Sequence, residues 1–215
     1  MFRHHDIARL GNENAESRCD PGADSSSPSF GAALLAGGAS KRMRADKALL
    51  QIDSPEGPIP LWLKQWKLLQ ILEPSELLFS GPARPGFPKD VTVLVDRWES
   101  SGPLAGIATC LSHVNAEFLF ILAVDLPRMD PNCLFEILRE CSRSRVGIVP
   151  VLDQRFEPLA AIYPKTAMER AVKRIAHNQL KLQDFIHELV LNRMVTPWEV
   201  PSKWAYCFLN WNEPV

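Results

Sequence analysis

The chain lacks the features that mark secreted, membrane-spanning and metal-cluster proteins. Its five cysteines are an odd number and widely spaced, and no C-x-x-C pair suggests a zinc, iron–sulfur or redox site. Its longest apolar stretches, such as residues 118–124, are too short to cross a bilayer, and the first residues form no hydrophobic signal core. We therefore expect a cytoplasmic protein with reduced thiols that does not bind a membrane.

A dominant charge is also missing, since 24 Lys and Arg residues face 25 Asp and Glu residues and the net charge is -1. No overall field draws the protein onto nucleic acid. An anionic ligand must therefore be bound by a local cluster of basic residues. The apolar share of 46% and the charged share of 23% are those of an ordinary globular protein, and 215 residues suffice for one hydrophobic core.

Two common nucleotide-binding loops are absent from the sequence. It contains no G-x-x-x-x-G-K-[ST] motif, and no G-x-G-x-x-G motif follows the first expected strand. By that criterion the protein is neither a Walker-type NTPase nor a dinucleotide-binding dehydrogenase.

The N-terminal segment 1–28 differs in composition from the rest of the chain. It is rich in Ser, Asn, Asp, Glu and Gly, and such a segment buries too little apolar surface to offset the entropy lost on ordering. We expect a disordered tail over residues 1–28 and a single domain over residues 29–215.

Segments with strand and helix patterns alternate along this domain. The expected strands are 31–36, 77–80, 91–95, 118–124, 146–151 and 159–163, and the expected helices are 60–72, 104–114, 131–141, 165–177 and 180–189. Residues 192–197 and 205–209 also have an extended pattern. The continuous small apolar run of the first strand is typical of a strand covered on both faces. This order predicts an α/β domain with right-handed crossovers and a parallel sheet.

The segment after the first expected strand is basic and contains two glycines. Ligands of open parallel sheets bind outside the carboxyl ends of the strands. Gly37 and Gly38 leave backbone N–H groups free to approach an anion, and four basic residues with one acidic residue follow up to Lys47. The Arg42 guanidinium can fork onto phosphate oxygens, and Lys47 supplies a point charge. The segment predicts a polyphosphate site; the alternative is a glycine turn followed by a solvated basic helix end.

Two carboxylates follow other expected strands. Asp96 comes directly after the strand 91–95, and Asp125 comes directly after the strand 118–124. Mg²⁺ binds one or two protein carboxylates together with phosphate oxygens. Asp125 is the better candidate because a whole apolar strand holds it in place. The alternative for each residue is an aspartate that starts a turn or caps a helix.

The sequence offers no protein nucleophile for a covalent mechanism. The five histidines lie in the tail or in helix-like segments rather than at strand ends, and nothing near any cysteine would lower its pKa. Chemistry on the predicted polyphosphate ligand needs no such group, because it depends mainly on in-line positioning and neutralised charge.

Five segments together carry a resemblance to a known family. They are Leu35-Ala36-Gly37-Gly38-x-Ser40-x-Arg42-Met43, Asp46-Lys47-Ala48-Leu49-Leu50, Asp96 with Gly102-Pro103-Leu104-Ala105-Gly106-Ile107, Asp125-Leu126-Pro127, and Phe208-Leu209-Asn210-Trp211-Asn212-Glu213-Pro214. Over residues 31–214 the chain resembles the molybdenum cofactor guanylyltransferases of the nucleotidyltransferase superfamily. The first motif is specific to the superfamily, and its second glycine is more typical of guanylyltransferases than of the related cytidylyltransferases.

The resemblance implies a single Rossmann-like, three-layer α/β domain with a mostly parallel twisted sheet, of the nucleotide-diphospho-sugar transferase type. It implies transfer of GMP from Mg-GTP to the terminal phosphate of molybdopterin or Mo-molybdopterin, giving the guanine dinucleotide cofactor and pyrophosphate. Mg²⁺ is the implied cofactor, and enzymes that insert or accept the molybdenum cofactor are the implied protein partners. By the same likeness, catalysis falls to Arg42, Lys47 and Asp125, nucleotide binding to Leu35, Ala36, Gly37, Gly38, Lys47, Ser80, Asp96, Gly102 and Asp125, metal binding to Asp125, and acceptor binding to Asn210 and Asn212.

Three positions differ from the usual pattern of the family. Arg44 stands where the family usually has Gly, Ser80 where it usually has Asn, and Arg128 where it usually has Phe. Arg44 adds a bulky cation inside the phosphate loop, and Ser80 alters the recognition of base or ribose. Three alternatives therefore stay open: a cytidylyltransferase for the same pterin, a transferase for a sugar or alcohol phosphate, and a non-catalytic member that binds nucleotide or pterin.

Overall fold

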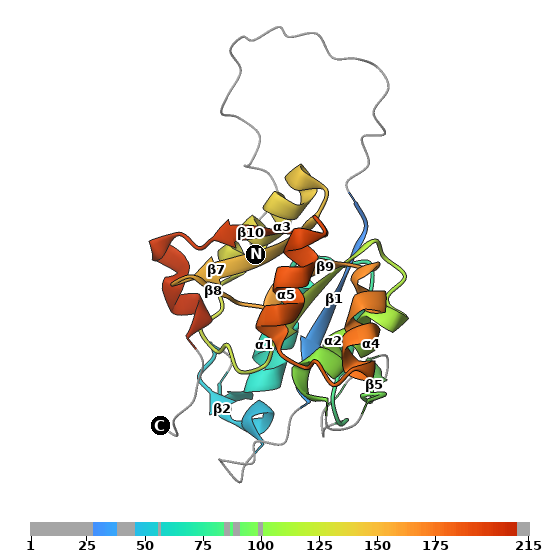
Figure 1. Cartoon of the computed structure of the whole chain (residues 1–215). Helices are drawn as coiled ribbons and strands as arrows, with labels where there is room; N and C mark the ends of the chain where they lie inside the picture. The colour runs from blue at the N-terminus through green and yellow to red at the C-terminus, as the bar shows by residue number, and fades with distance from the viewer. Residues whose placement is uncertain are drawn as a thin grey trace, which may run out of the picture.

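A central sheet with helices on both faces forms the core of the structure (Figure 1). The computed structural model describes residues 28–37, 46–55, 57–83, 87, 91–98 and 101–209. The strands of the sheet are β1 (Phe30–Leu35), β4 (Leu77–Ser80), β5 (Thr92–Leu94), β6 (Phe118–Ala123), β7 (Gly147–Leu152), β8 (Arg155–Phe156), β9 (Ala160–Pro164) and β10 (Val195–Glu199). They lie in the order β10-β7-β9-β6-β1-β4-β5, and β8 pairs with β7.

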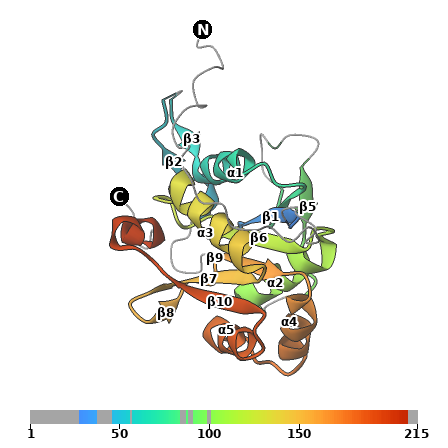
Figure 2. The same ribbon diagram turned by 90° about the horizontal axis from the view of Figure 1, so that it is seen from above.

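The helices form two layers, one on each face of the sheet. They are α1 (Leu61–Ile71), α2 (Gly102–His113), α3 (Pro131–Ser144), α4 (Ala167–Ala176) and α5 (Leu182–Leu191). α1 and α3 cover one face, whereas α2, α4 and α5 cover the other (Figure 2). Trp62 and Phe120 are buried in the first core, and Ile107 and Phe185 are buried in the second. The expected three-layer α/β architecture is therefore confirmed.

The sheet is mostly parallel, as the alternation of strands and helices predicts. β1 pairs in parallel with both β4 and β6, so that Leu35 lies opposite Ser80 on one side and Ala123 on the other. β4 and β5 are also parallel. β9 runs antiparallel to both β6 and β7. β1, β4, β5 and β6 therefore end at the same edge of the sheet, which is where α/β proteins bind ligands.

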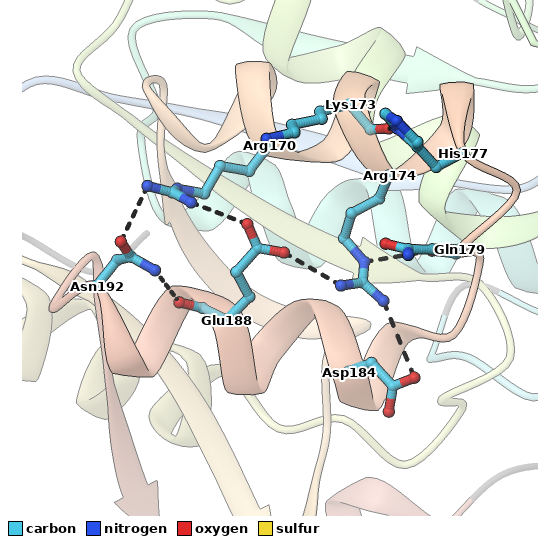
Figure 3. A network of polar contacts seen from close by, with 8 residues as sticks. All are labelled: Arg170, Lys173, Arg174, His177, Gln179, Asp184, Glu188 and Asn192. Atoms are coloured by element: carbon cyan, nitrogen blue, oxygen red, sulfur yellow. Dashed lines mark hydrogen bonds and ion pairs between the residues drawn. The ribbon is translucent and has the colours of Figure 1, made fainter.

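A network of charged side chains joins α4 to α5 (Figure 3). The Glu188 carboxylate accepts hydrogen bonds from Arg170 at 2.9 Å and from Arg174 at 3.1 Å. Arg174 also lies 3.9 Å from Asp184, and Arg170 donates to the Asn192 side chain at 2.9 Å. Burial alone would raise the pKa of Glu188, but the hydrogen bonds and charges of the two arginines outweigh it and lower that pKa. The network therefore fixes the two helices against each other.

The extended conformation expected for residues 205–209 is wrong. Residues 205–209 lie largely in a 3-10 helix, η2 (Ser202–Phe208), and not in a strand. Large and small side chains alternate in this segment, which imitates the period of a strand. In the structure, a turn of three residues instead directs Trp204, Cys207 and Phe208 toward the core on the α1 and α3 side of the sheet.

Four short elements have no counterpart among the expected ones. They are the 3-10 helix η1 (Lys47–Leu49), the antiparallel hairpin of β2 (Gln51–Ile52) and β3 (Ile59–Pro60), and the strand β8. Elements of two or three residues are too short to show a period in the sequence. In addition, α2 begins at Gly102 rather than at residue 104, with Pro103 in its first turn, where proline is favoured.

The expected tail over residues 1–28 lies almost entirely outside the described residues, so it stays a prediction. Over the ranges that the structure does describe, no helix combines the length and the apolar character needed to cross a membrane.

Candidate functional site

A cavity of about 220 Å³ lies at the edge of the sheet where β1, β4, β5 and β6 end. Segments that are far apart in the sequence contribute to its wall, which consists of Leu35, Ala36, Gly37, Asp46, Lys47, Ala48, Ser80, Asp96, Pro103, Gly106, Ala123, Val124, Asp125 and Leu159. Gly37, Lys47 and the two aspartates, which come from segments after separate strands, thus surround one space.

Backbone groups of neighbouring strands pack closely beside this cavity. Ala36 N donates to Ser80 O at 2.8 Å, and Gly81 N donates to Leu94 O at 3.0 Å. Gly81 has a φ of +140°, and a Cβ at this position would lie 2.8 Å from Gly37 N. A side chain there would push the glycine turn away, so Gly81 is required for the close approach of the two segments.

Lys47 is placed by a short, capped helix. The Asp46 carboxylate caps η1 by accepting from Ala48 N at 3.0 Å. Ala48 is buried, and Leu61 N donates to Leu50 O at 2.8 Å, which ties the end of η1 to the start of α1. Lys47 is half-buried on the cavity wall. Its ammonium group is therefore carried by a segment that is anchored on both sides.

Asp96 is half-buried in the cavity wall. Ser80 Oγ donates to Asp96 Oδ1 at 3.2 Å. The carboxylate lies beside two glycines, since a Cβ at Gly37 would lie 3.9 Å from Oδ2 and a Cβ at Gly106 would lie 3.7 Å from Oδ1. Burial raises the pKa of Asp96, and the Ser80 hydrogen bond offsets part of this rise. When ionised, the group can accept hydrogen bonds from a ligand but cannot donate them.

Asp125 follows a strand whose end is firmly held. Ala123 N donates to Leu159 O at 2.7 Å, and Val124 N donates to Leu35 O at 3.0 Å. The Asp125 side chain is half-buried and lines the cavity. In the described part of the chain, no three His, Cys, Asp or Glu side chains are grouped so as to hold a metal. A carboxylate that faces a cavity fits Mg²⁺, which completes its coordination with water and substrate phosphates.

Glu157 is a second carboxylate near Asp125, and it is not among the predicted site residues. β6 and β9 are antiparallel with Leu122 opposite Ala160, and Glu157 lies in the segment that leads into β9, close enough to Asp125 for the two charges to interact. Burial raises the pKa of Glu157, the Arg155 charge lowers it, and the Asp125 charge raises it further. Glu157 directly follows β8, a two-residue strand that has no counterpart among the expected strands, so reading the residue after each expected strand does not find it.

Most of the predicted site residues meet at the cavity. Leu35, Ala36, Gly37, Lys47, Ser80, Asp96 and Asp125 line it. Gly102 begins α2 next to the lining residue Pro103. Gly38, Arg42, Asn210 and Asn212 lie outside the described residues, as does Arg44. The positions of the cavity residues are thus established, while the role of each predicted residue stays a prediction.

Several wall residues were not predicted as site residues: Asp46, Ala48, Pro103, Gly106, Ala123, Val124 and Leu159. Four of them belong to segments that carry the family resemblance, so their sequence context was available as a signal. Leu159 had no such signal, because its place depends on the pairing of β9 with β6. Thr109 was not predicted to support the site either. Its buried hydroxyl accepts from Arg97 N at 3.3 Å and anchors the segment after Asp96.

The described cysteines are unsuited to nucleophilic chemistry. Cys110, Cys133, Cys141 and Cys207 are free and buried. Burial raises the pKa of Cys110 and of Cys141 to about 12, so almost no reactive thiolate is present at neutral pH. None of these four buried thiols is therefore a candidate nucleophile, and any chemistry at the cavity has to depend on positioning and charge.

Comparison with known protein families identifies the kind of domain that holds this cavity. The model of the MobA-like NTP transferase domain matches residues 32–193, which is most of the chain. The chain belongs to the MobA-like NTP transferase family. A protein of Opitutus terrae named "Probable molybdenum cofactor guanylyltransferase" is 31% identical over 187 residues, covering 85% of this chain and 90% of that protein.

Solved structures share the fold of this family member. Molybdopterin-guanine dinucleotide biosynthesis protein A from Archaeoglobus fulgidus has a TM-score of 0.64 at 22% identity, over 86% of this chain and 93% of that chain. The 2-C-methyl-D-erythritol 4-phosphate cytidylyltransferase of Thermus thermophilus has a TM-score of 0.58 at 16% identity, over 85% and 92% of the two chains. Because proteins named for different nucleotides share this fold, the fold alone does not determine the base.

Proposed function

We propose that the protein transfers GMP from GTP to the terminal phosphate of molybdopterin or Mo-molybdopterin and releases pyrophosphate. The observation that carries this proposal is the presence of Gly37, Lys47, Asp96 and Asp125 in the wall of one cavity. A glycine turn, a cation and carboxylates around one space match the needs of a nucleoside triphosphate with its divalent cation. Membership of the MobA-like NTP transferase family and the name of the Opitutus terrae relative support the choice of substrates.

The proposed reaction is an in-line substitution at the α-phosphorus of GTP. A terminal phosphate oxygen of the pterin attacks the α-phosphorus and forms a new P–O bond. The bond from the α-phosphorus to the oxygen that bridges the β-phosphate breaks, and pyrophosphate leaves with the electron pair. The attacking oxygen is already ionised at neutral pH, so no general base is needed. The task of the protein is to align the two phosphates and to neutralise their charge.

Each cavity residue has a part in this alignment. Lys47 offsets the negative charge of the triphosphate, and the backbone of Gly37 allows the phosphates to approach closely. Asp125 is the carboxylate that would hold Mg²⁺. When bound, Mg²⁺ withdraws charge from the phosphate oxygens and makes pyrophosphate a better leaving group.

Asp96 is the residue that favours guanine in this proposal. Its Oδ1 accepts from Ser80, which leaves Oδ2, on the Gly37 side, to accept from the nucleoside. An ionised carboxylate is an acceptor only. Guanine presents two adjacent donors, N1–H and the 2-amino group, whereas cytosine presents a single amino donor beside acceptors. Asp96 can also accept from ribose hydroxyls, which do not distinguish the bases.

The test is a turnover assay with the four nucleoside triphosphates, each labelled at the α-phosphate. The purified protein is incubated with Mg²⁺ and molybdopterin, and both pyrophosphate release and the label in the pterin product are measured. We expect product from GTP alone. Product from CTP alone would identify a cytidylyltransferase, and product only with a sugar or alcohol phosphate would identify a different acceptor. Binding of GTP without turnover would identify a non-catalytic member of the family.

A cytoplasmic location belongs to the same proposal, as does transfer of the product to enzymes that insert or accept the molybdenum cofactor. Both follow from the substrates, because the pterin product has to reach the enzymes that use it.

A further inference from the structure

Helix α1 contacts both of the segments that bring charged groups to the cavity. At its first residue, Leu61 N donates to Leu50 O at 2.8 Å, which connects the helix to the end of η1. One turn later, the side chains of Lys64 and Gln65 reach the turn that follows Asp125. α1 therefore bridges η1, which carries the cavity lysine, and the carboxylate expected to hold the metal.

The contacts of α1 with the second segment are made to backbone carbonyl groups. Gln65 Nε2 donates to Leu126 O, and Lys64 Nζ donates to Pro127 O. Leu126 O also closes the turn by accepting the backbone N–H three residues further on, at 3.1 Å. The Leu126 side chain is buried, at 2% exposure. The carbonyl groups of the two residues directly after Asp125 are thus held by side chains from a helix that is distant in the sequence.

Gln65 is an uncommon residue for its surroundings. It is completely buried at 0% exposure, and Trp62, Trp66 and Leu69 of the same helix are buried in the apolar core. Its side-chain oxygen has no hydrogen-bond partner among the described residues. Burial of an amide with one end unsatisfied lowers stability, and an apolar side chain of similar size would avoid that penalty. A contribution of the amide other than to stability is therefore expected.

Lys64 makes the neighbouring contact, and its charged group is also partly removed from water. Its side chain is half-buried, and burial lowers the pKa of its ammonium group. Together Lys64 and Gln65 hold both carbonyl groups of the turn, so the turn cannot shift along α1 without breaking two hydrogen bonds.

We propose that Gln65, assisted by Lys64, is a positioning residue for Asp125. By fixing the turn after β6 against α1, the pair sets the place of the Asp125 carboxylate relative to η1 and its lysine. The inference rests on the proposed function, since only there is Asp125 the metal ligand. Substitution of groups that orient a metal ligand typically lowers metal affinity or activity about 10- to 100-fold.

The test compares Gln65→Met with Gln70→Met. Both replace a glutamine of α1 by an apolar side chain of similar length, but Gln70 is exposed. Binding of Mn²⁺ is measured by electron paramagnetic resonance in the presence of GTP and without acceptor, so no turnover is required. We expect the Mn²⁺ dissociation constant to rise about tenfold or more in Gln65→Met and to stay at the wild-type value in Gln70→Met. The affinity for GTP without metal should be the same in both variants.

A second pair keeps the test valid if Gln65→Met does not fold. Lys64→Met removes the other side-chain donor to the turn, and Lys67→Met is its control on the exposed face of the same helix. We expect a weaker affinity for Mn²⁺ in Lys64→Met and no change in Lys67→Met. The affinity for metal-free GTP should again be unchanged.

The outcomes separate the inference from the proposed function. If the wild type binds Mn²⁺ with GTP and the variants at positions 64 and 65 match their controls, the inference is overturned and the proposed function stands. If Gln65→Met loses affinity for metal-free GTP as strongly as for Mn²⁺, its role is merely structural and the inference is again overturned. If the wild type binds no Mn²⁺ with GTP, the proposed function fails and the inference fails with it.

Discussion

Two regions of the molecule shift the pKa of a partly buried carboxylate in opposite directions. Between α4 and α5, Glu188 is met by two arginines, and its pKa is lowered. At the cavity, Asp96 accepts from one neutral hydroxyl, that of Ser80, and burial raises its pKa. The first arrangement stabilises the fold. The second leaves a partly buried carboxylate in the cavity wall at the expense of stability, as is common at functional sites. Under the proposed function, this carboxylate binds the nucleoside.

The two carboxylates therefore influence stability with opposite dependence on pH. Glu188 has a folded pKa below its ordinary value of 4.5, so it contributes stability above that pH and the contribution is lost as the pH falls through the folded pKa. Asp96 has a folded pKa above its ordinary value of 3.8. Its effect is most favourable below that pH, and stability is lost as the pH rises through the folded pKa.

The largest effect on the cavity side of this comparison is expected for the substitution Asp125→Asn. Asn supplies a neutral oxygen in place of a charged carboxylate, so the variant should lose turnover by about 10²- to 10³-fold while its melting temperature stays unchanged. The measurement is pyrophosphate release at saturating Mg²⁺. Asp153→Asn, at an exposed turn position, is the matched control and should keep wild-type turnover. Full activity of Asp125→Asn would place the metal elsewhere.

The next largest effect is expected for Lys47→Met. A hydrogen bond to a charged group contributes about 1.5–3 kcal/mol, which corresponds to a rise in KM for GTP of about 10- to 100-fold. Lys173→Met on the exposed surface of α4 is the control. Steady-state kinetics with varied GTP measures the effect. A fall in melting temperature with an unchanged KM would show that Lys47 serves the fold instead of the ligand.

Asp96→Asn should weaken nucleotide binding and yet stabilise the protein. We expect about tenfold weaker affinity for GTP at pH 7, because a charged acceptor is lost. At the same pH the melting temperature should rise, because a partly buried charge is removed. In the wild type, affinity should fall as the pH approaches the raised pKa of Asp96 from above, and this dependence should be absent from the variant. Calorimetric titrations and thermal unfolding between pH 4 and pH 8 provide both readouts, and a variant less stable than the wild type at pH 7 contradicts the account.

The smallest effect on activity is expected for Glu188→Gln. Loss of the two charged hydrogen bonds should lower the free energy of unfolding by about 1–2 kcal/mol at pH 7, between the values for exposed and buried pairs. The difference from the wild type should shrink as the pH falls below 4.5 and through the lowered pKa of folded Glu188. Urea unfolding measures the change, with Glu169→Gln on α4 as the control. A loss of turnover in Glu188→Gln would show that the two regions are not separate.

The sequence predicts the cavity edge well because the governing rule is simple. Continuous apolar strands that run in parallel all end at one edge, so Asp96 and Asp125 are found by reading the residue after each strand. The glycine turn before Lys47 is found in the same way. Each of these expectations depends only on the local pattern and on the direction of the strands.

The remaining parts of the site depend on pairings between distant segments. Gln65 reaches Leu126 across 61 positions of the sequence, and no local pattern indicates that contact. Glu157 lies between β8 and β9, and its place near Asp125 depends on the pairing of those strands with β7 and β6. The 3-10 helix η2 was mistaken for a strand because its alternating large and small residues imitate a strand, while burial of Cys207 and Phe208 decides its actual form.

The central claim is that Lys47 and Asp125 bind one triphosphate and its cation together. A crystal structure of the protein with GTP and Mn²⁺, located by its anomalous signal, tests this most directly. The account predicts Mn²⁺ on the Asp125 carboxylate and on phosphate oxygens that also contact Lys47, with guanosine beside Asp96. Mn²⁺ bound away from Asp125, or a triphosphate that does not contact Lys47, would contradict it.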